Sequence, residues 1–301
     1  MVSARNLRQR AALIQSVRTF FIERGYLEVD TPIRVPAPAP EAYIEPEPAG
    51  DWFLQTSPEL CMKRLLAADL PKLFQICKCF RRHERGSLHL PEFTMLEWYQ
   101  AEADYGDLMK ECEQLLPFVA KSLGLDHEIA TAGGPVSLVA PWQRLTVAEA
   151  FARYGKMGLA EALAGDCFDE VLVRDIEPHL GRETPTFLYD YPAVLGSLAR
   201  LQPGNPEVAE RFELYVDGVE LANGFSELSD AEEQRRRFED ERRLIIRQGR
   251  QPAGPMPEAF LAELPRMGPA AGIALGIDRL LMLFLKAGTI DEVVPFPPES
   301  L

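Results

Sequence analysis

The stretch Phe74–Tyr99, FQICKCFRRHERGSLHLPEFTMLEWY, decides the fold of this chain. Residues 74–80 alternate large apolar with smaller or polar side chains, which is the period-two pattern of a half-buried strand. Residues 81–87 crowd five ionisable groups into a turn, and residues 93–99 are rich in the aromatic and branched side chains that favour a second strand. We therefore expect a hairpin with a basic loop and an acidic return strand, which can hold an anion with a cation beside it.

The composition is that of a globular chain. Its 301 residues are 47% apolar and 26% charged, enough to bury a large core as one big domain or two small ones. The net charge of −14 repels phosphate backbones and argues against broad nucleic-acid binding, although a local basic patch remains compatible with it. No apolar run reaches the ~18 residues needed to cross a bilayer, and the basic N-terminus lacks the apolar segment of a secretory signal. We expect no membrane association.

The cysteines indicate a reducing compartment. Their number is odd and no disulfide spacing appears, so we expect a cytoplasmic protein. Cys77 and Cys79, near His83 and His89, raise the alternative of a zinc site, but the usual second pair of ligands is missing. On a strand these two thiols would share one face as small core residues, and we favour that interpretation.

Periodicity and end signals predict the remaining elements. The predicted helices are 7–21 (capped by Asn6 and ended by Gly25), 60–68, 105–123, 142–154 (with Thr146 and Glu149 as a capping box), 169–180 and 231–248. The predicted strands are 26–29, 52–55 and 185–191, and the proline-rich segments 35–50 and 252–269 are expected to be connectors.

The helix at 60–68 has a marked N-terminal signal. Thr56 or Ser57 can cap it, Pro58 suits its first position, and Glu59 falls in its first turn. Glu59 there can simply complement the helix dipole, or it can face a ligand. The local sequence leaves both open.

Residues 213–222 form a second predicted hairpin. Asp217-Gly218 between apolar runs is a strong two-residue turn signal, and it would pair Val216 with Val219, Tyr215 with Glu220, and Glu213 with Ala222. Glu213 and Glu220 would then lie diagonally on one face, where two carboxylates repel unless a cation such as Mg²⁺ lies between them. The alternative is an ordinary solvated face of an antiparallel sheet.

Three segments together resemble the class II aminoacyl-tRNA synthetases in their lysine-type version. FxxCxxFR and H-x-PEFTMLEWY within 74–99 are similar to motif 2, residues 26–32 to motif 1, and residues 272–280 to motif 3. Their order and spacing agree with the family over nearly the whole chain. Within the family, the chain resembles the truncated relatives of lysyl-tRNA synthetase whose acceptor is elongation factor P.

The resemblance implies a fold class and a set of partners. The fold would be α+β, a class II catalytic domain over residues 1–301 with a central antiparallel sheet flanked by helices and no anticodon-binding domain. The segment around motif 1 would form much of a homodimer interface. The substrates would be ATP with Mg²⁺, lysine or (R)-β-lysine, and elongation factor P. Because the chain begins at motif 1, we do not expect tRNA as a partner.

The resemblance also implies site residues. Arg81 and Arg279 would be catalytic, with Arg81 on the α-phosphate of ATP, Arg279 on the γ-phosphate and one face of adenine, and Phe93 on the other face. The residues implied to bind the amino acid are Ser57, Pro58, Glu59, Glu97, Tyr99, Glu227 and Ala274. Those implied to bind ATP are Arg81, His89, Phe93, Glu213, Glu220, Leu221, Gly276 and Arg279, with Glu213 and Glu220 also holding the metal.

Three positions depart from the family pattern. The glutamate of the usual R-x-E is His83 here, with Glu84 one residue later, and Leu90 replaces an asparagine. Either Glu84 or backbone amides would then recognise the adenine edge, and His83 and Leu90 are assigned no role. Ala274 stands where full-length lysyl-tRNA synthetases carry glycine, and its methyl group could favour the shifted amine of β-lysine.

These observations leave three functions to weigh. The first is ATP-dependent activation of a lysine isomer and its transfer to a lysine of elongation factor P. The second is aminoacylation of tRNA, and the third is a non-catalytic paralogue that binds a ligand or partner and regulates it, because a shared fold does not by itself give a shared activity.

Overall fold

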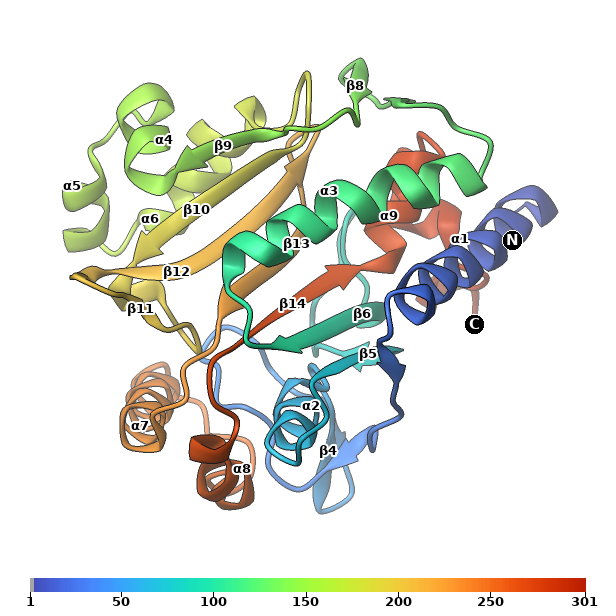
Figure 1. Cartoon of the computed structure of the whole chain (residues 1–301). Helices are drawn as coiled ribbons and strands as arrows, with labels where there is room; N and C mark the ends of the chain where they lie inside the picture. The colour runs from blue at the N-terminus through green and yellow to red at the C-terminus, as the bar shows by residue number, and fades with distance from the viewer. Residues whose placement is uncertain (1–2) are drawn as a thin grey trace.

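A central sheet organises the molecule. The computed structural model describes residues 3–301; Met1 and Val2, the start of the basic N-terminal segment, lie outside the described residues. The strands follow one another in the order β1-β5-β6-β14-β13-β12-β10-β9, with β11 paired to β12 (Figure 1). Their bounds are β1 (Leu27–Glu28), β5 (Lys72–Phe80), β6 (Glu92–Ala101), β14 (Ala270–Gly276), β13 (Val219–Ser226), β12 (Asn205–Val216), β10 (Thr186–Pro192), β9 (Gln143–Thr146) and β11 (Leu201–Gln202).

The sheet is antiparallel through its centre and parallel at its two ends. β1 pairs with β5, and β9 with β10, in parallel, whereas all pairs from β5 through to β10 are antiparallel. Helices flank it, so the predicted α+β class is confirmed. Two small sheets lie outside it, formed by β2 (Arg34–Val35), β4 (Trp52–Leu54) and β3 (Pro48–Ala49), and by β7 (Glu128–Ala130) and β8 (Pro135–Ser137).

Three groups of helices cover the sheet. α1 (Ala4–Glu23) and α3 (Tyr105–Ser122) cross one face, and α9 (Ile277–Phe284) lies beside them (Figure 1). α4 (Val147–Tyr154), α5 (Leu159–Ala164) and α6 (Phe168–Val171) gather near β10. α2 (Glu59–Leu66), α7 (Ala231–Arg247) and α8 (Glu258–Glu263) pack together on the far side of β6 and β14.

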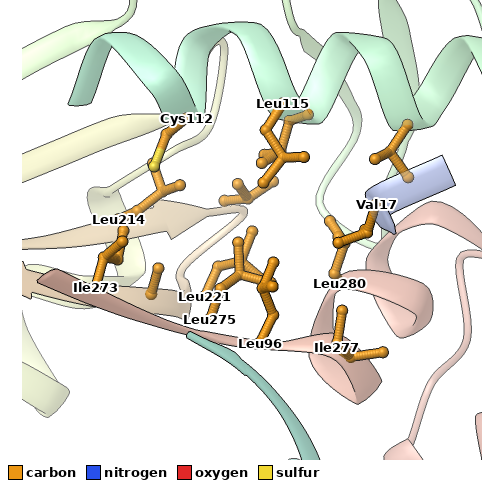
Figure 2. Packing of buried hydrophobic residues seen from close by; sticks show 14 of the residues in the cluster. Val17, Leu96, Cys112, Leu115, Leu214, Leu221, Ile273, Leu275, Ile277 and Leu280 are labelled. Atoms are coloured by element: carbon orange, nitrogen blue, oxygen red, sulfur yellow. The ribbon is translucent and has the colours of Figure 1, made fainter. Parts of the chain in front are cut away.

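The main core lies between α3 and the central strands. Figure 2 shows Cys112 and Leu115 of α3 pointing toward Leu214 of β12 and Ile273 of β14. These side chains are 0 to 2% exposed, so the apolar stripe of α3 is removed from water as its helical spacing requires. The opposite face of the same strands is thereby left for polar side chains.

The predicted hairpin at 74–99 is confirmed, and an aromatic cluster anchors it to α1. Phe74 pairs with Trp98 across β5 and β6, and the ring of Phe21 stacks on Phe74 at 5.0 Å between centroids. The Sγ atoms of Cys77 and Cys79 lie 3.9 Å apart on one face of β5, as expected for core thiols of a strand.

Several predicted boundaries were wrong. Ser3, not Asn6, caps α1, and its side chain accepts a hydrogen bond from the Asn6 amide. The helix predicted over residues 142–154 begins only at Val147, because residues 143–146 form strand β9 and pair with β10. The predicted capping box of Thr146 and Glu149 is present.

Three further expectations need correction. Residues 252–269 are more than a connector, because α8 forms within them and buries Phe260 and Leu261 against α2 and α7. The helix expected at 169–180 is split into α6, a π turn and a 3₁₀ turn. The predicted start of α2 was also wrong, because the helix begins at Glu59 and not at Pro58. The Ser57 hydroxyl accepts a hydrogen bond from the Glu59 amide.

Among residues 3–301 no helix is both long and apolar enough to traverse a bilayer.

Truncating Phe21 should test the aromatic cluster. Its side chain is 0% exposed, so Phe21→Ala is expected to lower the free energy of unfolding by about 3–5 kcal/mol through lost burial and a cavity. Ile246→Ala, on α7 and 60% exposed, serves as the control and should change it by about 0.5 kcal/mol or less. Urea denaturation of both variants measures the difference, and equal effects would contradict this account of the core.

Candidate active site

A cavity of about 440 Å³ lies against the polar face of the central strands. It brings together all but two of the residues predicted for the site. Those predicted for the amino acid that line it are Ser57, Glu59, Glu97, Tyr99 and Ala274. Those predicted for ATP that line it are Arg81, His89, Phe93, Glu213, Glu220, Leu221, Gly276 and Arg279. The two that do not line it are Pro58 and Glu227.

Glu97 is the buried carboxyl group at one end of the cavity. It lies on β6 opposite Ala274 of β14 and is 1% exposed. Its oxygens accept hydrogen bonds from the Ser57 hydroxyl at 2.6 Å and the Tyr99 hydroxyl at 2.7 Å. Burial, reinforced by the charge of Glu59, raises the pKa of Glu97 to about 7, so a cation placed beside it would be needed to hold it fully ionised.

Glu227 lies one layer behind the cavity wall. Its Oε2 forms an ion pair with the Lys63 ammonium at 2.5 Å, and within residues 3–301 neither oxygen, including the more distant Oε1, is aligned with a hydrogen-bond donor. Burial raises the pKa of Glu227 to about 8 even though Lys63 opposes the shift. A buried carboxylate oxygen without a partner indicates a place where a donor can bind.

Gly272 connects Glu227 to the cavity. A Cβ at Gly272, which lines the cavity, would stand 2.5 Å from Glu227 Oε1 and 2.2 Å from the ring of Tyr99. Both separations are shorter than van der Waals contact, so only glycine fits without movement of its neighbours. The missing side chain leaves Glu227 next to the space in which a ligand would lie.

Arg81 follows β5 and has donors to spare. Its Nε is buried without a hydrogen-bond partner in the described part of the chain, and its ion pair with Glu84 is long, at 3.8 Å. The guanidinium lies 5.2 Å from the centre of the Phe93 ring. A half-buried guanidinium with open donors is suited to a phosphate or carboxylate group.

Arg279 is held by two separate segments. From the first turn of α9 it donates to the Glu220 carbonyl at 2.8 Å and to the Leu88 carbonyl at 3.3 Å. Its Nη2 lies 2.7 Å from His89 Nε2. Burial and the positive charge of Arg279 lower the pKa of His89, which keeps the ring neutral and able to accept this bond. Arg279 therefore fastens the loop after β5 to the β12–β13 hairpin.

The β12–β13 hairpin contains a bulge that was not predicted. Val216 pairs with Val219 and Tyr215 with Glu220 as expected, but Glu213 pairs with Asn223, not with Ala222. The register shift occurs between Leu214 and Tyr215. An extra residue on β13 is the usual form of a β-bulge. Glu213 and Glu220 still line the same cavity, so the shared face is confirmed although its register was wrong.

In the structure, each of these two carboxylates contacts an arginine. Arg211 contacts Glu213 at 2.6 Å, the Tyr215 hydroxyl donates to Glu213 at 2.6 Å, and Arg279 contacts Glu220 at 3.2 Å. Within residues 3–301 no three His, Cys, Asp or Glu side chains form a group that could hold a metal. Two carboxylates that line one cavity nevertheless fit Mg²⁺, which commonly takes one or two protein carboxylates and completes its shell with phosphate oxygens and water.

The loop after β5 shows how the chain accommodates its departures from the family pattern. His83 is exposed, has a φ of 65°, and does not line the cavity, whereas Glu84 does. Leu90 is 4% exposed and forms part of the wall. The left-handed turn at His83 thus brings the following carboxylate to the cavity.

Four residues of the site were not predicted, and two of them had a signal in the sequence. Lys63 follows Glu59 by four residues on α2, a spacing that places both on one helix face. Arg211, Glu213 and Tyr215 alternate along β12 and therefore share a face. Asp278 precedes Arg279 but has no pattern of its own, and Glu41 lies in a proline-rich segment without periodicity.

A buried ion pair joins α1 to the site. Arg10 lies 2.5 Å from Asp278 and donates to the Thr94 hydroxyl at 2.7 Å. Asp278 in turn accepts the Thr94 amide at 2.7 Å. Because Thr94 is next to Phe93 and Asp278 is next to Arg279, Arg10 fixes the backbone on both sides of the cavity.

Comparison with known proteins gives consistent results. The family model described as tRNA synthetases class II (D, K and N) matches residues 2–300. The chain is 41% identical over 331 residues to the elongation factor P--(R)-beta-lysine ligase of Pectobacterium carotovorum subsp. carotovorum (strain PC1), covering 99% of this chain and 96% of that protein. It is 40% identical over 311 residues to the protein of the same name from Proteus mirabilis (strain HI4320), covering 98% and 95%.

Replacing Arg10 should show how much the buried ion pair contributes. Arg10→Met leaves Asp278, whose side chain is 3% exposed, as an uncompensated charge, and is expected to cost about 3 kcal/mol or more of unfolding free energy. Arg18→Met is the matched control on the same helix; its pair with Glu28 is 44% and 34% exposed and should contribute less than about 1 kcal/mol. Denaturant titration distinguishes the two, and similar losses would contradict the assigned role of Arg10.

Proposed function

Because this chain belongs to the class II tRNA synthetases of the D, K and N types, we propose that it uses ATP to activate a lysine and transfers the resulting acyl group to elongation factor P. Relatives of about 40% identity over nearly its full length carry the name elongation factor P--(R)-beta-lysine ligase. The amino acid is accordingly (R)-β-lysine or lysine, and the acceptor is a lysine side chain of elongation factor P.

The buried acidic end of the cavity carries this proposal. Glu59, Glu97 and Arg81 with its open donors line the cavity, and Glu227 lies behind Gly272 with its Oε1 unpartnered within the described residues. A substrate with an ammonium group on its side chain and a carboxylate at its other end fits that polarity. An amino acid with an apolar side chain would leave these buried carboxyl groups without a partner.

Activation joins the amino acid to the nucleotide. Its carboxylate oxygen attacks the α-phosphorus of ATP, the bond to the β-phosphate oxygen breaks, and pyrophosphate leaves. Arg81 would stabilise the charge on the α-phosphate, and Arg279 would bind the γ-phosphate and adenine opposite Phe93. Glu213 and Glu220 would hold Mg²⁺, which when bound supplies positive charge to the phosphates.

Transfer needs no nucleophile from this chain. The amine of the acceptor lysine attacks the carbonyl carbon of the mixed anhydride, AMP leaves, and the released protons pass to solvent. The cavity accelerates the transfer by holding the amine and the carbonyl carbon in the reactive orientation. Ala274 pairs with Glu97 across β14 and β6, so its methyl group is placed to influence which amine position the pocket accepts.

We also propose a homodimer in the cytoplasm. The segment from α1 through motif 1 to Ile33 leaves apolar side chains in water, as expected for a surface that meets a second copy. These are Leu7, Ile22, Leu27 and Ile33, each 37 to 57% exposed.

An acceptor assay should test the proposed transfer. With labelled lysine or β-lysine and ATP, label should appear on elongation factor P and not on total tRNA. Arg81→Gln should lower the rate by about 10²-fold or more through loss of charge stabilisation. Arg82→Gln, next to it but exposed and outside the cavity, should stay near the wild-type rate. Labelling of tRNA alone would refute the proposed acceptor, and absence of lysine-dependent ATP–pyrophosphate exchange would refute the enzyme.

The KM for lysine should depend on pH with a defined sign. Glu97 and Glu227 have pKa values raised to about 7 and about 8, so both are ionised above these values and become neutral as the pH falls through them. The lysine side chain stays protonated over this range. Its KM should therefore rise on acidification, which pyrophosphate exchange at saturating ATP measures. A flat or falling KM would show that these carboxyl groups do not bind the ammonium.

A further inference from the structure

Lys63 is a buried ammonium that the mechanism above does not use. Its side chain is 1% exposed, and it does not line the cavity. Its Nζ contacts the carboxylates of Glu59 and Glu227 and lies 4.9 Å from the centre of the Phe225 ring. Burial disfavours the charge of Lys63, but Glu227 and Glu59 together raise its pKa above the ordinary value. The group is therefore a fixed internal cation.

Stability alone gives little reason for such a group. Removing two opposite charges from water costs about as much as their attraction returns, and an apolar pair of the same volume often serves as well. The placement of Lys63 against the two carboxylates of the amino-acid pocket suggests a role in binding.

We propose that Lys63 is a positioning residue that aligns Glu227 and favours its ionised form when an ammonium group binds, so that the pocket selects a substrate with two ammonium groups. This inference rests on the proposed function. With all three carboxyl groups ionised around a bound substrate, Glu59, Glu97 and Glu227 set against Lys63 leave two negative charges. A lysyl group joined to AMP has lost its carboxylate charge and carries two ammonium groups, which balance them. Burial raises the pKa of Glu41, a further carboxyl group that lines the cavity, to about 7, and the positive charge of Arg81 opposes that shift.

The groups around Glu227 support this assignment. Lys63 and Glu59 face it from α2, Glu97 and Tyr99 from β6, and Gly272 from β14. Lys63 is the one cation among them, and the other ionisable groups favour protonation of Glu227. Without Lys63, Glu227 would be a buried carboxyl group surrounded by acids, and a bound ammonium group would have to hold it ionised alone.

Calorimetric titration of the full chain with lysine, and with norleucine as an analogue without the second amine, tests the inference. Lys63→Met should weaken lysine binding about tenfold or more at neutral pH and should leave norleucine binding unchanged. The loss of lysine affinity in Lys63→Met should become smaller as the pH rises, because the Glu227 carboxyl group then ionises without Lys63. Lys63→Arg keeps the charge and should restore the wild-type pH profile. Arg64→Met, the neighbour whose pair with Glu263 is exposed, should bind lysine normally.

A double substitution guards against a variant that does not fold. Glu227→Gln removes one of the two carboxylates that Lys63 contacts and makes the pocket less negative, so lysine should bind poorly. Lys63→Met combined with Glu227→Gln removes both charges and should bind lysine better than Glu227→Gln alone, whereas a structural role alone predicts that the double variant is worst. That result, or Lys63→Met with unchanged lysine affinity, would overturn the inference while lysine binding by the wild type still stands. Failure of the wild-type chain to bind lysine would overturn both this inference and the proposed function.

Discussion

The pairing of β14 with β6 on one side and β13 on the other is the constraint from which the site follows. It sets Ala274 between Glu97 and Asn223, and Gly272 between Tyr99 and Phe225. Because a register shift of one residue would turn every side chain to the opposite face, this single alignment decides which groups face the cavity and which face α3. Residues far apart in the chain are thus placed together by backbone hydrogen bonds before any ligand arrives.

Burying the carboxyl groups of the site costs free energy, and neighbouring side chains offset part of that cost. Glu213 has Arg211 and Tyr215, Glu97 has Ser57 and Tyr99, and Glu227 has Lys63. Each carboxyl group is buried enough for its pKa to rise, so each is only partly satisfied by the protein. A site whose polar groups are aligned but incompletely neutralised is preorganised for a ligand of opposite charge.

The sequence was informative where one local rule decides the structure. The Asp217-Gly218 turn and the Thr146 capping box formed as predicted because each depends on neighbouring residues alone. The bulge opposite Leu214 and the strand at 143–146 depend on tertiary pairing, which no local pattern encodes. The helix at 258–263 forms where Phe260 and Leu261 pack against α2 and α7. The prolines on either side of it made the whole segment resemble a connector in the sequence. For the site, the resemblance supplied the carboxylates and arginines, whereas Asp278 and Glu41 become visible only once α9 and the proline-rich segment are placed in space.

Gly272 has a consequence for how this chain could lose its activity in evolution. A change of one nucleotide can turn a glycine codon into an alanine codon, and the methyl group gained would collide with Tyr99 and cover Glu227. The surrounding strands would keep their hydrogen bonds, because an alanine is readily accommodated in the backbone of a sheet. The product of a duplicated gene could therefore keep its fold and its surface while losing the ability to bind the amino acid. The residue at position 272 alone would then distinguish the inactive copy from the active one.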